Sequence, residues 1–187
     1  MRIQLFALPL AALVLVAAAP APASPQASVR PAVHDHHGSR TVVGVASRDA
    51  RFSTLVAAVQ AANLVDTLNG RGPFTVFAPV NGAFDALPAG TVERLLQPGQ
   101  RDALTRVLTY HVVPGRISAR DLLGAVRAGG GRATLTTVEG RVLTVTADAH
   151  GALTLTDGRG NAIDVVVADV QASNGLIHAI DEVLLPG

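Results

Sequence analysis

The stretch that decides the fold is residues 72–84, whose sequence is GPFTVFAPVNGAF. Phe74 to Phe77 combines aromatic and β-branched residues, which suit a pleated and largely buried strand. Pro79 lacks a backbone donor and disfavours helix in the residue before it, so the strand should end there. We expect Asn81 to cap the helical turn that follows. The stretch therefore predicts a central strand and its exit turn.

The first 23 residues have the composition of a secretory signal peptide. Arg2 gives a positive start, residues 5–19 are apolar, and Ala21-Pro22-Ala23 matches a signal peptidase site before Ser24. A membrane anchor is the alternative, but a span needs about 20 apolar residues. We expect residues 1–23 to be removed and the product to be secreted or periplasmic, with no membrane span left after cleavage.

Charge and cysteine content narrow the class of protein. The sequence has 15 Lys and Arg against 14 Asp and Glu, and cleavage would remove Arg2, which leaves 14 of each sign. Nucleic-acid binding needs a basic surface field, so we expect no nucleic acid partner. The chain has no cysteine, which excludes disulfides and a lipid-modified N-terminal Cys.

The mature chain divides into a leader and one domain. Residues 24–40 are rich in Pro, Ala, Ser and His without periodicity, which predicts a disordered leader before a domain over residues 41–187. Apolar spacing predicts short helices at residues 52–64, 64–68, 83–87, 91–96, 100–108 and 119–123, the last capped by Ser118. Other runs predict strands at residues 41–46, 74–77, 110–113, 134–138, 141–147, 152–156, 163–170 and 176–185. Helices mostly come before strands, which predicts an α+β domain.

Three blocks of the sequence, in this order and spacing, resemble the fasciclin (FAS1) domain family. The first includes Thr75, Phe77, Pro79, Asn81 and Phe84, the second begins at Tyr110-His111, and the third includes Asn174, Gly175, His178, Ile180 and Asp181. The resemblance covers about residues 42–186. One departure is Val80, where the family usually has Thr or Ser, so no side-chain hydrogen bond is expected from that position.

The resemblance implies a FAS1-like β-wedge packed against a group of short helices, with the first and third blocks side by side inside. Family members are extracellular and are associated with cell adhesion and matrix contacts, and single-domain members are common among secreted bacterial proteins. What it implies here is a secreted, non-enzymatic adhesion module without a cofactor, which we expect to be a monomer. Its partner would be an extracellular protein or polysaccharide.

Tyr110-His111 has two interpretations. In animal members of the family this dipeptide and its apolar neighbours are implicated in integrin recognition, which makes it a candidate adhesion motif. The alternative is that Tyr110 packs inside with its hydroxyl bonded and that His111 is buried. We favour the second interpretation, because a bacterial host has no integrin partner unless it meets animal tissue.

Residues able to bind metal or move protons are few. His178 and Asp181 lie three apart in a predicted strand, so their side chains leave opposite faces and cannot share one ion. We expect Asp181 to accept backbone donors and His178 to be hydrogen-bonded inside. The candidate metal ligands are His34, His36 and His37 in the leader, which suit zinc, copper or nickel. A solubilising leader is the interpretation we favour for them.

Two other functions are weighed against adhesion. The first is a small-ligand or metal-binding extracytoplasmic carrier, which would use the cleft between helices and wedge or the histidine-rich leader. The second is a hydrolase, which is disfavoured because the chain has no Cys and no Ser in a nucleophile-elbow context. Convergent titrating groups in a cleft would favour a carrier or an enzyme, and a flat or grooved apolar patch would favour adhesion.

Overall fold

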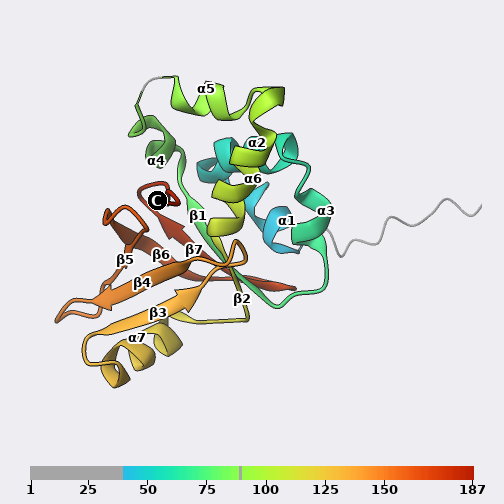
Figure 1. Ribbon diagram of the computed structural model, residues 1–187. Helices are drawn as coiled ribbons and strands as arrows, with labels where there is room; N and C mark the ends of the chain where they lie inside the picture. The colour runs from blue at the N-terminus through green and yellow to red at the C-terminus, as the bar shows by residue number, and fades with distance from the viewer. Residues whose placement is uncertain (1–39, 89) are drawn as a thin grey trace, which may run out of the picture. The chain divides into compact units, whose positions relative to one another are not determined.

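The computed structural model describes residues 40–88 and 90–187 (Figure 1). The predicted signal peptide, nearly all of the predicted leader, and the candidate ligands His34, His36 and His37 lie outside the described residues.

Seven strands form one sheet in the order β2-β1-β7-β6-β5-β4-β3. Their bounds are β1 Phe74–Pro79, β2 Val112–Pro114, β3 Arg132–Thr136, β4 Val142–Ala147, β5 Leu153–Thr156, β6 Ala162–Ala172 and β7 Gly175–Ile180. β1 and β7 pair in parallel, and every other neighbouring pair is antiparallel. Beyond β3, the amide of Val138 donates to the carbonyl of Val112 over 2.7 Å. The two edges of the sheet therefore meet, and the strands curve into a wedge that is nearly a barrel.

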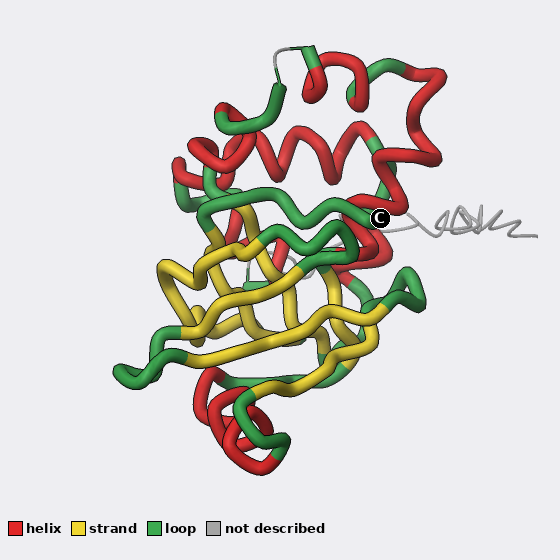
Figure 2. The backbone as a smooth tube through the Cα atoms, turned by 60° about the vertical axis from the view of Figure 1, so that its left-hand side comes forward, coloured by secondary structure: helices red, strands yellow, loops and turns green. Residues whose placement is uncertain are grey.

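The helices lie on two sides of this wedge. They are α1 Val42–Ala46, α2 Ser53–Ala61, α3 Val65–Asn69, α4 Asn81–Asp85, α5 Thr91–Leu95, α6 Arg101–Tyr110 and α7 Ala119–Ala128, with 3₁₀ turns at Ala50–Phe52 and Pro98–Gln100. Helices α1 to α6 gather on one side, and α7 lies beside β3 at the other (Figures 1 and 2). Ser118 caps α7 in a capping box with Asp121, as predicted. The α+β class and the β-wedge are confirmed.

β1 divides the apolar interior into two cores. Val76 and Ala78 pack with residues of α1, α2 and α6, whereas Phe77 points into the wedge with Tyr110 and Ile180. This alternation follows from the two-residue period of a strand. Phe77 pairs with His178 in the β1–β7 register, and both Phe77 and Ile180 are fully buried. The prediction that the first and third blocks lie side by side in the core is confirmed.

The predicted first strand over residues 41–46 is wrong, because Val42–Ala46 is helix α1. The Thr41 hydroxyl accepts from the amide of Gly44 over 3.2 Å and so caps the helix. The amide of Val42 donates to Oδ1 of Asn174 over 2.9 Å, a partner 132 residues away. A β-branched run that locally predicts a strand is therefore a helical turn with a local cap and a distant contact at its start.

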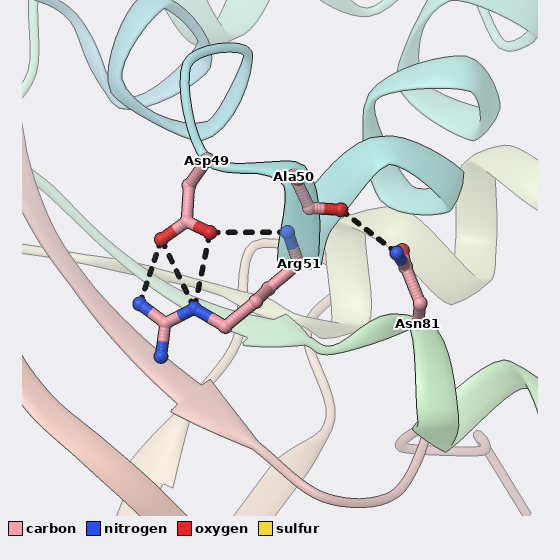
Figure 3. A network of polar contacts seen from close by, with 4 residues as sticks. All are labelled: Asp49, Ala50, Arg51 and Asn81. Carbon is pink, nitrogen blue, oxygen red and sulfur yellow. Dashed lines mark hydrogen bonds and ion pairs between the residues drawn. The ribbon is translucent and has the colours of Figure 1, made fainter.

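The predicted role of Asn81 is also wrong. Asn81 is the first residue of α4, whose N-cap is Val80, without a side-chain cap. The Asn81 side chain instead reaches the start of α2, where Oδ1 accepts from the amide of Thr54 over 3.1 Å. Its Nδ2 donates to the carbonyl of Ala50 over 2.8 Å, beside the Asp49–Arg51 ion pair (Figure 3). Asn81 therefore caps a helix that precedes it in the chain.

Two predicted strands differ from the observed ones by more than a shift of one or two residues at their ends. Tyr110 ends helix α6, and β2 begins only at Val112. β7 ends at Ile180 instead of Leu185, and in the run after it the amides of Leu184 and Leu185 donate to the side chains of His111 and Asp157. Val183 and Leu184 in this run are nevertheless buried, since they are at most 5% exposed.

Candidate functional site

Asn174 joins three segments at the end of the sheet where β1 and β7 begin. Its Oδ1 accepts from the amide of Val42, and its Nδ2 donates to the carbonyls of Leu68 over 2.7 Å and Gly70 over 3.1 Å. Its own carbonyl accepts from the amide of Phe74 over 3.0 Å. One asparagine thus fixes the start of α1, the end of α3 and the start of β1.

The backbone around Asn174 is packed too closely for side chains at two glycines. A Cβ on Gly175 would lie 2.0 Å from the carbonyl oxygen of Phe74, and a Cβ on Gly72 would lie 2.0 Å from that of Asn174. Both positions need glycine because the strands approach backbone to backbone. This end of the sheet is consequently well defined in position.

Thr75 and His178 hold the loop between β2 and α7. The Thr75 hydroxyl donates to the carbonyl of Gly115 over 2.8 Å and accepts from the amide of Ile117 over 2.9 Å. His178 Nε2 lies 2.9 Å from the carbonyl of Ile117, and its Nδ1 accepts from the amide of Asp169 over 3.2 Å. The proton is therefore assigned to Nε2 from its partners. His178 is fully buried and stacks on Phe77, with ring centroids 5.5 Å apart.

Asp181 lies on the surface just beyond β7, away from His178. Its Oδ1 accepts from the amide of Asp164 over 2.9 Å, and its own amide donates to the carbonyl of Asp164 over 3.2 Å. This reciprocal pair bonds the end of β7 to β6. Asp181 and His178 do not form one site.

Tyr110 and His111 are both interior, with 0% and 2% of their surface exposed. The Tyr110 hydroxyl donates to the carbonyl of Val142 over 3.3 Å, and burial raises the pKa of Tyr110 above its usual value. His111 donates from Nδ1 to the carbonyl of Val107 over 2.7 Å and accepts at Nε2 from the amide of Leu184 over 3.0 Å. In this conformation neither side chain can touch a partner.

Burial also sets the protonation of His111. It lowers the pKa of His111 from 6.5 to about 4, although the bond to the Val107 carbonyl opposes that shift. The ring is therefore neutral at physiological pH. A neutral imidazole with one donor and one acceptor is what the Val107 carbonyl and the Leu184 amide require.

Asp157 is a structural residue that sequence reasoning missed. Its carboxylate accepts from the amides of Arg159 and Asn161, each over 2.9 Å, and from the amide of Leu185 over 3.3 Å. The Asp157-Gly158 pair predicts only the local turn. The bond to Leu185, which fixes the C-terminal run, has no signal in the local sequence.

Three hollows differ in chemistry. An almost wholly apolar cavity of about 30 Å³ lies between α1, α2, α6 and the sheet, with the His111 ring in its wall. An open groove of about 550 Å³ follows α5 and α6, and its lining includes Leu95, Val107, Leu185, Asp102, Arg106 and Arg159. A third hollow, of about 320 Å³, is polar and lies beside Asn174.

The part of the chain in residues 40–88 and 90–187 contains no group of three or more His, Cys, Asp or Glu side chains placed to hold a metal ion. Nor does any helix in it combine the length and the apolar character needed to cross a membrane.

Comparisons with known proteins agree with this architecture. The chain is 50% identical over 148 residues to Protein sll1483 of Synechocystis sp., covering 78% of this chain and 73% of that protein. It is 36% identical over 150 residues to the cell surface glycolipoprotein MPB83 of Mycobacterium bovis, covering 78% of this chain and 60% of that protein.

The FAS1 domain pair of the insect cell adhesion molecule Fasciclin I has a similar fold, with a TM-score of 0.67 at 23% identity. The match covers 78% of this chain and 50% of that one, so this chain spans about half of the pair. The family model described as Fasciclin domain matches residues 50–186. The chain therefore belongs to the fasciclin (FAS1) domain family.

Proposed function

We propose that this chain is a secreted, non-enzymatic interaction module that contacts an extracellular protein or polysaccharide. The observation that carries this proposal is that the side chains of the family motifs form hydrogen bonds within the fold. Thr75, His111, Asn174, His178 and Asp181 each bond backbone groups of other segments. These side chains stabilise the wedge, so we expect other residues, on the surface, to contact the partner.

The relatives and the sequence support an exterior location. One relative is named a cell surface glycolipoprotein, and the similar solved structure comes from a cell adhesion molecule. The first 23 residues have the composition of a signal peptide. The fasciclin family is generally non-enzymatic, which agrees with the structural use of the histidines.

The hollows favour contact with a large partner. The groove along α5 and α6 is open and mixes apolar side chains with Asp102, Arg106 and Arg159, which resembles the mixed composition of protein surfaces that bind others. The apolar cavity, at about 30 Å³, is far smaller than the roughly 300 to 1,000 Å³ of typical small-molecule pockets. That cavity gives the carrier alternative no support.

The test is attachment of the purified protein, immobilised on beads, to intact cells and to envelope and matrix fractions of the cells that make it. We expect saturable attachment, and sensitivity to protease or to glycosidase digestion would identify the partner as protein or polysaccharide. An unrelated domain of similar size and charge is the control. Equal attachment of the control, or no attachment to any fraction, would refute the proposal.

A further inference from the structure

Two arginines frame the polar hollow at the end of the sheet where β1 and β7 begin. Its lining residues are Arg71, Gly72, Pro73, Arg116, Ser173 and Asn174, and none of them is acidic. The volume is about 320 Å³, and both arginines are exposed. The hollow is therefore a concentration of positive charge on a chain whose formal net charge is only +1.

The topology brings these residues together from three distant segments. Arg71 lies in the loop from α3 to β1, Arg116 follows β2, and Ser173-Asn174 is the turn from β6 to β7. β1 and β7 are parallel, and β2 and β6 run antiparallel to them, so all four strands have an end here. The amide of Ser173 also donates to the carbonyl of Arg40 over 2.8 Å, which brings the backbone of a third arginine to the same turn.

The backbone on both sides of Arg116 is fixed by the Thr75 hydroxyl, which bonds Gly115 and Ile117. The Arg116 guanidinium donates to Oε1 of Gln171 and, over 3.4 Å, to the carbonyl of Ala172. A guanidinium has five N–H donors, so three remain for a ligand. Arg116 is therefore held in place while part of its hydrogen-bonding capacity stays open.

The loop that carries Arg71 is fixed as well. The carbonyl of Gly70 is bonded by Asn174, and the carbonyl of Pro73 accepts from the amide of Gly115 over 2.9 Å. Gly72 has no room for a side chain against Asn174. The Arg71 guanidinium itself makes no hydrogen bond or ion pair with any residue that the structure describes. All of its donors are available, on a rigid base.

We propose that this hollow binds the anionic groups of an acidic polysaccharide, an inference that rests on the proposed function and names its partner class. A guanidinium pairs with carboxylate and sulfate through two parallel hydrogen bonds. Exposed ion pairs are individually weak, so one small anion is held poorly. A polymer with repeated uronate or sulfate groups meets many copies on a surface at once, and avidity then raises the affinity.

The test compares two double variants that remove the same charge. R71Q/R116Q empties the hollow of arginines, and R94Q/R127Q removes two exposed arginines from α5 and α7. Each protein is immobilised at one density and titrated with polygalacturonate, with dextran as the neutral polymer. We expect R71Q/R116Q to bind about tenfold more weakly than wild type or more, R94Q/R127Q to bind like wild type, and added salt to weaken binding. Arg116 also bonds Gln171 and Ala172. If the double variant melts at a lower temperature than wild type, binding by the single variant R71Q is compared with wild type instead.

The outcomes separate this inference from the proposed function. Equal loss of polygalacturonate binding in both double variants would mean that binding responds to net charge alone. That result would overturn the assignment of the binding site to this hollow. Attachment to cell envelope without binding to polygalacturonate would overturn the inference and leave the proposed function standing. Absence of attachment to cell envelope and of binding to polygalacturonate would overturn the inference and the proposed function together. Binding of DNA as tightly as polygalacturonate, through the same two arginines, would overturn the polysaccharide assignment.

Discussion

His111 and Leu184 are joined by a buried hydrogen bond, in which the Leu184 amide donates over 3.0 Å to Nε2 of the imidazole. The two residues are 73 positions apart, and the bond ties the end of α6 to the run after β7. A protonated ring has no acceptor for that amide. The contact therefore exists only while His111 is neutral.

Stability should consequently fall with acidification. The pKa of His111 is lowered to about 4 in the folded protein, whereas an unfolded histidine has about 6.5. The folded state binds fewer protons, so the contribution is complete above about pH 6.5 and is lost as the pH falls toward 4. At about 1.4 kcal/mol per pH unit the loss reaches about 3 kcal/mol.

Thermal melts between pH 7.5 and 4 measure this loss, with H111Q as the control. A glutamine amide keeps one donor and one acceptor but does not titrate, so its pH dependence should be shallower than that of wild type. The same dependence in both proteins would show that His111 is not the group responsible.

Asn174→Ala should lower the free energy of unfolding by about 2 to 4 kcal/mol, since it leaves backbone groups of Val42, Leu68 and Gly70 without their partner. Asn174→Asp keeps the acceptor for Val42 but sets a carboxylate oxygen against the carbonyls of Leu68 and Gly70, so a loss at least as large is expected. Urea unfolding measures both. A change below about 0.5 kcal/mol in N174A would contradict the role assigned to this residue.

Phe77→Ala and Ile180→Ala should each cost about 2 to 5 kcal/mol, because both side chains are fully buried in the wedge. A domain of this size typically has about 5 to 15 kcal/mol in total, so melting temperature and secretion yield should both drop sharply. Thr134→Ala, on an exposed position of β3, is the matched control and should have little effect. If both core variants melt like wild type, the central-strand assignment is wrong.

Local sequence predicts much of this fold because the spacing of apolar residues along the chain indicates the strands and their buried positions. The strands from β3 to β6 were predicted to within two residues at each end. Ser118 reads correctly as a helix cap because its partner, Asp121, is three residues away. Apolar period and nearby caps are thus recoverable without a structure.

The remaining features depend on partners far along the chain. The start of α1 is fixed by a bond from Val42 to Asn174 besides its local cap, and Asn81 caps a helix that starts 28 residues earlier. The hollow with Arg71 and Arg116 likewise exists only once three loops meet. No local pattern reports such contacts, which is why the candidate surface was not predicted while the core was.

Processing of the N-terminus is a further prediction. The protein recovered from outside the cytoplasm should begin at Ser24, because Ala21-Pro22-Ala23 matches a signal peptidase site. Intact-mass measurement on culture and periplasmic fractions gives the answer. A species that retains residues 1–23 and stays with the membrane would rule out this cleavage.

The central claim is that the family-motif residues build the interior while recognition lies on the surface, and Tyr110→Phe tests it most directly. The change removes only the hydroxyl that donates to the Val142 carbonyl, so it should cost about 0.5 to 1.5 kcal/mol. At a temperature where both proteins are folded, the bead assay should give equal attachment for wild type and variant. Loss of attachment with an unchanged melting temperature would show that Tyr110 contacts the partner, and would contradict the account.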